Sequence, residues 1–295
     1  LYPTGNIDKR WEPIGREGSF WNDSFKGIFD GDNHTISGMV VSSYSEFPGS
    51  APGKFPSYYY EGLFGALDGA IVRNLNMKDC FIYQGKNAIA TGFLAGYMSQ
   101  SQIINCHVNG CRIVVKSPDL APRDATNSKT VCIGGIVGQG SGSGKTFNSC
   151  SFDGKISVTI DYMKSTSFLN WGRCSLYVSG LMGLGASTLE KCQSNGTIDI
   201  NATGDEDDGD IMVSGLCYEA ENVTCCKSGM NFNLNSEGNI ANGKALWLYT
   251  LCHNGKNISR SAATGTITVG SNQGWKGELG NVKTATSVTD CAFYT

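Results

Sequence analysis

The chain of 295 residues repeats itself, and this repetition limits its fold more than any other feature. Short apolar segments that end in glycine recur at 62–65, 93–96, 135–138 and 180–183, and a weaker copy at 215–218 ends in tyrosine. Each is followed by a polar turn and then by one or two further strand-like segments of alternating polarity. Self-similarity at a period of about 20–50 residues is typical of stacked repeat architectures.

The second strand-like segments align into one column of apolar or small residues. Its members are Met39, Leu75, Cys106, Cys150, Cys192, Cys226, Ser261 and Cys291, with spacings of 36, 31, 44, 42, 34, 35 and 30 residues. One such unit cannot enclose a core, but stacked units can, because each unit pairs with its neighbours. The pattern predicts an all-β protein, a right-handed parallel β-helix (β-solenoid) of about eight three-strand coils. The 39 glycines would then supply the corners of the coils.

Five cysteines of this column form a predicted structural ladder inside the solenoid: Cys106, Cys150, Cys192, Cys226 and Cys291. Equivalent positions of neighbouring strands lie about 4.7–4.9 Å apart, and a buried cysteine packs as a small apolar side chain. The alternative is a metal or redox cluster, but the sequence has no Cys-x-x-Cys pair and no histidine at ligand spacing. Whether any of the 12 cysteines form cross-rung disulfides stays open at this point.

Composition narrows the class of partner. Charged residues make up 17% of the chain and the net charge is -3, so no nucleic-acid interface is expected. No apolar run approaches the roughly 18 residues that a membrane-spanning helix needs. Residues 1–24 lack the pattern of a signal peptide, which is also what a mature chain that has lost its leader would show.

Several motifs resemble those of GLUG-repeat proteins. Residues 25–36 are similar to an F-x-G-x-F-D-G-x-x-H-x-I opening, and residues 11–15 to the W-x-P-I-G stretch before it. Residues 61–65, followed by 71–75, resemble the first GLUG unit. The N-C-x-x-x-G corner of these repeats is matched at 105–110, 150–154 and 192–196. The resemblance covers residues 10–295 and is strongest over 25–110.

The resemblance implies an extracellular or cell-surface β-solenoid, of a bacterial kind common in gut Bacteroidetes and described there as candidate adhesins. We expect an N-terminal cap segment over residues 1–24 and a solenoid over 25–295, with degenerate repeats or a C-terminal cap over 245–295. The repeat residues of the family are structural, so no catalytic residue is predicted. No H-E-x-x-H zinc motif occurs either.

Three insertions interrupt the repeat, at 44–60, 117–129 and 161–175, and insertions in repeat proteins often form a binding face. The first and third contain aromatic residues, whose rings stack on sugars or anchor protein partners. The predicted ligand-binding residues are Tyr44, Phe47, Phe55, Tyr58, Tyr59, Tyr60 and Trp171. The alternative is that these side chains fold back over a corner of the solenoid.

An acidic run at 204–210 is a weak candidate for a cation site. Its carboxylates suit Ca²⁺, which prefers oxygen ligands; they belong to Asp205, Asp207, Asp208 and Asp210. A solvated loop is the alternative, because the pattern of an EF-hand is missing. No other cofactor is expected, since the glycine-rich stretch 138–146 has Gln139 where a phosphate-binding loop needs glycine.

The sequence therefore predicts a secreted or cell-surface adhesion module that binds a glycan or protein partner on a host or bacterial surface, and not an enzyme. The alternative is a carbohydrate-active β-helix enzyme, a polysaccharide lyase or hydrolase, since parallel β-helices carry such activities. Charged residues do not recur as paired sets across adjacent units, which disfavours catalysis. A spacer without a ligand is the third alternative.

Overall fold

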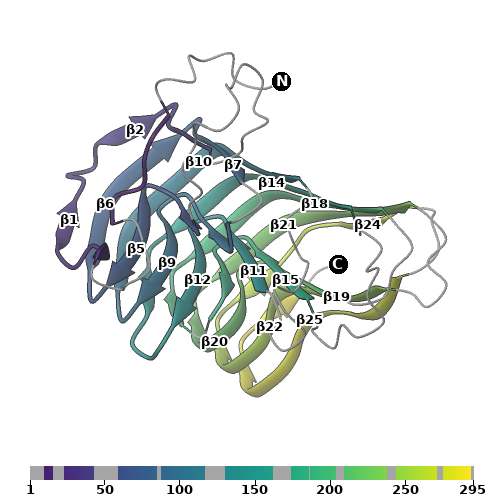
Figure 1. The fold of residues 1–295 in the computed structure, drawn as a ribbon. Coiled ribbons are helices and arrows are strands. Elements are labelled where there is room, and N and C mark those ends of the chain that lie inside the picture. The colour runs from purple at the N-terminus through teal and green to yellow at the C-terminus, as the bar shows by residue number, and fades with distance from the viewer. Residues whose placement is uncertain are drawn as a thin grey trace.

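The structure is a computed structural model that describes residues 10–15, 23–42, 59–84, 88–116, 130–161, 174–185, 187–203, 209–237, 244–270 and 275–293. Within these ranges the backbone forms 26 β-strands and no α-helix. Figure 1 shows the strands stacked rung upon rung, and neighbouring rungs pair in parallel. The parallel β-helix expected from the repeat is confirmed.

The strands belong to eight successive coils. The first four coils hold β1 (Ile28–Asp30), β2 (Thr35–Ser37), β3 (Val40–Ser42); β4 (Tyr60–Glu61), β5 (Phe64–Asp68), β6 (Ile71–Lys78), β7 (Phe81–Gln84); β8 (Ala90–Thr91), β9 (Ala95–Ser99), β10 (Gln102–Lys116); β11 (Thr130–Gly134), β12 (Val137–Ser141), β13 (Thr146–Asn148) and β14 (Ser151–Asp161). The last four hold β15 (Cys174–Ser179), β16 (Met182–Leu184), β17 (Thr188–Glu190), β18 (Gln193–Thr203); β19 (Gly209–Ser214), β20 (Cys217–Thr224), β21 (Lys227–Glu237); β22 (Lys244–Ser259), β23 (Ala262–Ala263), β24 (Ile267–Val269); β25 (Trp275–Thr289) and β26 (Ala292–Phe293). One column of register partners crosses all eight coils: Phe29, Val72, Ile103, Phe147, Leu189, Val223, Ile258 and Val288.

The second, fourth and fifth coils each hold four strands, one more than the pattern of the sequence predicts. In the fourth coil, β11 precedes the glycine motif and β12 starts within it, so the motif forms the bend between two strands. The bend presses neighbouring backbones together, because a Cβ atom on Gly138 would lie 2.3 Å from the backbone nitrogen of Thr91. Hydrophobicity does not separate the two strands in the sequence, because the bend is as apolar as the strands themselves.

The predicted cysteine column faces the core. Cys106, Cys150, Cys192 and Cys226 are at most 2% exposed, whereas Cys291 in the last coil is half-buried. The backbone N–H of Cys192 donates to the Sγ atom of Cys226 at 3.4 Å, so these two positions stack. Burial raises the pKa of the Cys106 thiol to about 12, so this thiol stays protonated at pH 7, which is the unreactive form. The eleven cysteines whose side chains the structure describes are free.

Met39 does not belong to this column. The pairing of β3 with β7 puts Met39 beside Cys80, at the next corner of the coil. There the backbone N–H of Cys80 donates to the Sγ atom of Cys111 at 3.2 Å, which adds a second stack of cysteines. In the first coil the residue that approaches Leu75 is Gly31, in the turn after β1. Spacing alone therefore aligns the first coil with the others in the wrong register.

The residue before each position of the cysteine column turns the chain around a corner. Its φ angle lies between 49° and 56° in seven coils, at Asn74, Asn105, Ser149, Lys191, Cys225, Arg260 and Asp290. Among residues other than glycine, Asn and Asp adopt this left-handed conformation most readily. The Asn-Cys pair of the sequence motif is therefore a corner residue followed by a core residue.

The two ends differ from the centre. Of the predicted cap segment, Ile14 lies in the wall of the first coil and pairs with Phe64 on β5, whereas the backbone N–H of Trp11 donates to the carbonyl of Val40 on β3. In the last two coils, β22 and β25 run as continuous strands past the position of the bend. A register shift between Tyr249 and Cys252 is what remains of the glycine motif there.

Candidate functional site

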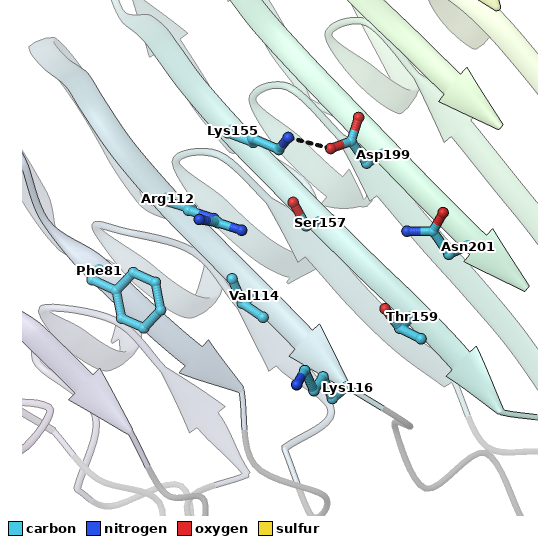
Figure 2. Close-up of a pocket in the computed structure, with 9 residues that line it drawn as sticks. All are labelled: Phe81, Arg112, Val114, Lys116, Lys155, Ser157, Thr159, Asp199 and Asn201. Atoms are coloured by element: carbon cyan, nitrogen blue, oxygen red, sulfur yellow. Dashed lines mark ion pairs between the residues drawn. The ribbon is translucent and has the colours of Figure 1, made fainter. Parts of the chain in front are cut away.

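A pocket of about 320 Å³ lies on the outer face of four neighbouring strands, β7, β10, β14 and β18. Side chains alternate along a strand, so every second residue of these strands faces outward. The register puts Arg112 beside Lys155, and Ser157 beside Asp199. Figure 2 shows the side chains that line the pocket: Phe81, Arg112, Val114, Lys116, Lys155, Ser157, Thr159, Asp199 and Asn201.

The pocket combines apolar and polar side chains that stand side by side on the outer face (Figure 2). Phe81 and Val114 are each 6% exposed and belong to one packed cluster. Among the polar residues, Nζ of Lys155 lies 2.5 Å from Oδ2 of Asp199, and Asn233 donates its Nδ2–H to Oδ1 of Asp199 at 2.8 Å. Both oxygens of this carboxylate are therefore engaged. Three basic side chains and one carboxylate line the pocket, so its formal charge is positive although the chain carries -3.

Two polar atoms of the pocket are buried and have no hydrogen-bond partner: Nε of Arg112 and Oγ of Ser157. Buried polar groups are nearly always paired, and leaving one unpaired costs about 1–3 kcal/mol. Arg112 and Lys155 are also register partners, so two positive residues stand on adjacent rungs, about 4.7–4.9 Å apart at the backbone. The unpaired buried atoms and the adjacent positive residues are both unfavourable in the protein without a ligand. Both are expected at a binding site.

The three predicted insertions are attached along one side of the solenoid. They begin after β3, β10 and β14, which occupy equivalent positions of successive coils through their pairing with β7 and with each other. They end at β4, β11 and β15, which are likewise aligned through β8. Lys116 is the last residue of β10, so the pocket reaches the edge at which the segment 117–129 begins.

The structure describes two of the predicted ligand-binding aromatics. Tyr59 is 38% exposed, whereas Tyr60 on β4 is buried. The ring of Tyr60 stacks on that of Tyr97, with 5.1 Å between the centroids. Tyr60 thus belongs to the wall of the solenoid. Outside the described residues lie Tyr44, Phe47, Phe55, Tyr58 and Trp171.

The weak cation site is described only in part. Asp210 is half-buried on β19, and outside the described residues lie Asp205, Asp207 and Asp208. Among the residues that the structure does describe, no three metal-ligating side chains come together. Lys145, from the glycine-rich stretch, is buried and donates from Nζ to the carbonyl of Gly142, so it closes its own turn.

In the sixth to eighth coils, larger residues replace the glycine that ends the motif. The register position of Gly183 is held by Tyr218 on β20, His253 on β22 and Lys283 on β25. The rings of Tyr218 and His253 stack with centroids 4.4 Å apart, and Tyr249 meets His253 edge-on at 4.8 Å. Nδ1 of His253 is buried without a hydrogen-bond partner. This aromatic cluster fills the space that the tight bend closes in earlier coils.

We expect acid to destabilise the C-terminal coils through His253. Burial, with a smaller effect of Lys283, lowers the pKa of His253 from 6.5 to about 4, although Glu278 acts in the opposite direction. The pKa values of Tyr218 and Tyr249 are raised by burial, so both stay neutral in acid. The unfolded chain takes up the proton first, so this stability is complete above about pH 6.5 and is lost as the pH falls toward 4.

Thermal unfolding of the wild type and of His253→Phe at pH 7 and pH 5 measures this effect. The fall in Tm should be several degrees larger for the wild type, because the variant keeps the ring and loses the titrating group. Equal falls in the two proteins would contradict the assignment.

No protein-family model matches the chain, and comparison with curated proteins and with solved structures finds no match. In the described ranges, no helix is long and apolar enough to cross a bilayer. What the pocket can bind must therefore be inferred from its own chemistry.

The sequence prediction missed this pocket because its residues come from four coils. Phe81, Arg112, Lys155 and Asp199 are separated by 31, 43 and 44 residues. The sequence nevertheless contains a pattern that points to the pocket. Aligning the outward positions, in the way that the inward cysteines were aligned, places Arg112 beside Lys155 and brings two positive residues together.

Proposed function

We propose that the protein is a secreted or cell-surface binding module that holds a glycan in the pocket across β7, β10, β14 and β18. The observation that carries the proposal is the pair of buried, unpartnered polar atoms on Arg112 and Ser157. They lie beside the apolar side chains of Phe81 and Val114, and apolar surface with a few convergent polar groups is typical of small-ligand sites. The secreted location and the role in adhesion draw on the resemblance to GLUG-repeat proteins.

Size and rigidity support a glycan rather than a protein partner. The volume of about 320 Å³ lies at the lower end of the roughly 300–1,000 Å³ range of small-ligand pockets. The lining residues stand on paired strands, so little conformational freedom is lost when a ligand binds. The attachment points of the three insertions lie on the same side, and inserted segments there can extend the contact along a polymer.

The charges of the pocket favour binding over hydrolysis. Glycoside hydrolysis generally uses two carboxyl groups, one on each side of the bond that breaks. Asp199 is the one carboxylate among the residues that line this pocket, and Lys155 and Asn233 engage it. We therefore propose binding without turnover.

A glycan array tests the proposal with two matched variants. Thr159→Trp places a large ring in the pocket, whereas Thr268→Trp adds the same ring to the outer wall three coils away. Wild type and Thr268→Trp should bind the same glycans, and Thr159→Trp should bind them at least tenfold more weakly. Equal binding by all three proteins, or no binding by the wild type, would overturn the proposal. Release of shortened products from a bound glycan would favour the enzyme instead.

A further inference from the structure

We propose that the glycan bound here carries a carboxylate on a sugar ring, as a uronate does, and that Arg112 and Ser157 bind this carboxylate. The inference rests on the proposed glycan-binding function and adds the chemical class of the sugar.

The guanidinium of Arg112 lacks an anionic partner in the part of the chain that the structure describes. Nε of Arg112 is buried and makes no hydrogen bond. The one carboxylate that lines the pocket, Asp199, accepts from Asn233 on one oxygen and pairs with Lys155 through the other. A buried donor of a positively charged group gains most from an anionic acceptor, because charge-assisted hydrogen bonds are about twice as strong as neutral ones.

Two positively charged residues also stand side by side in the pocket. Arg112 and Lys155 are register partners on β10 and β14, and like charges directly opposite each other destabilise a sheet. In the same outward column the preceding coil has Phe81 and the following coil has Thr197, so the fold does not require two cations here. Asp199 compensates the charge of Lys155, and an anion bound at this point would compensate that of Arg112.

The shape of the site favours a planar anion that is attached to a ring. A guanidinium is planar and presents paired N–H donors, which match the two oxygens of a carboxylate. Ser157 lies on the next strand, β14, beside Val114. Its hydroxyl donates to the same carboxylate. Phe81 and Val114 stand beside these polar residues on the same outer face (Figure 2), and they offer apolar surface to the C–H face of a ring. A uronate combines these two parts in one residue, because its carboxylate is attached to a sugar ring.

The test compares acidic polysaccharides with their carboxyl-reduced forms. The probes are hyaluronan, alginate and polygalacturonate, placed on the array beside the same polymers after chemical reduction of the carboxyl groups. The wild type should bind at least one acidic polymer, and should bind its reduced form at least tenfold more weakly. Binding should also weaken as salt is raised, because the contact is ionic.

Variants assign the contact to individual residues. Arg112→Gln and Ser157→Ala should each weaken binding of the acidic polymer, by roughly ten- to a hundredfold for the arginine. Lys227→Gln removes one exposed positive charge on β21, outside the pocket, and should change little. The Tm of Arg112→Gln should equal or exceed that of the wild type, because repulsion from Lys155 is removed. A purely structural arginine would lower it.

The outcomes separate the two proposals. Equal binding of acidic and reduced polymers overturns the uronate inference and leaves glycan binding in place. Unchanged binding by both Arg112→Gln and Ser157→Ala also overturns it. Absence of binding to any glycan overturns the proposed function. If Arg112→Gln lowers Tm sharply, Ser157→Ala still decides whether the pocket holds the carboxylate.

Discussion

Gly138→Val should prevent the central coils from folding. A Cβ atom at this position would lie 2.3 Å from the backbone nitrogen of Thr91 and 2.8 Å from the carbonyl oxygen of Gly96. These are backbone atoms of the neighbouring coil, so no side chain can rotate away to make room. We expect a loss of about 3 kcal/mol or more in the free energy of unfolding, or no soluble protein. Thermal and urea unfolding followed by circular dichroism measure this.

Gly142→Asn is the matched control, four positions later in the same coil. Gly142 has a φ of 70°, and the nearest atom to a Cβ there, the hydroxyl oxygen of Ser99, is 3.8 Å away. Gln100 already occupies the equivalent corner of the preceding coil with a φ of 47°. The control should unfold within about 1 kcal/mol of the wild type. Similar losses in the two variants would show that the bend is not the tight point of the coil.

Cys226→Asp should destabilise the solenoid about as strongly. Cys226 is 2% exposed, and its thiol donates to the carbonyl of Thr224 within the core. A carboxylate there would lose its hydration without gaining a positive partner, which costs several kcal/mol even after its pKa rises. We expect about 4 kcal/mol or more, measured by urea unfolding at pH 7.

Cys225→Asp tests the same substitution one residue earlier. Cys225 is exposed and has a φ of 55°, and the equivalent corner of the last coil is Asp290, with a φ of 52°. The variant should match the wild type within about 0.5 kcal/mol. If Cys225→Asp proved the more damaging of the two, the assignment of inward and outward positions along this strand would be wrong.

The inward side of the solenoid could be predicted from the sequence because stacking imposes one residue type on one position of every coil. Cys106, Cys150, Cys192 and Cys226 fill the same site in four consecutive coils, so their spacing alone reveals the period. The corner before them is also regular, since the left-handed conformation favours Asn at positions 74 and 105.

The outward side could not be predicted in the same way. One outward column contains Phe81, Arg112, Lys155 and Thr197, four residues with little in common. Side chains on this face meet solvent or ligand, so packing does not force the same residue type to recur in every coil. The site therefore leaves no periodic pattern in the sequence. The alignment of Met39 with Leu75 is wrong for a related reason. The first coil turns through Gly31 without a cysteine, and spacing alone could not fix its register.

All three insertions are attached between the same two strand positions of the coil, so their sequences can change while the core stays the same. Lengthening a loop twofold costs only about 0.6 kcal/mol of closure entropy, and the buried columns lie elsewhere in the coil. Segments between β10 and β11, or between β14 and β15, can therefore be exchanged while the core sequence is kept. A combinatorial library confined to these two connections would vary recognition on a scaffold whose folding it leaves alone.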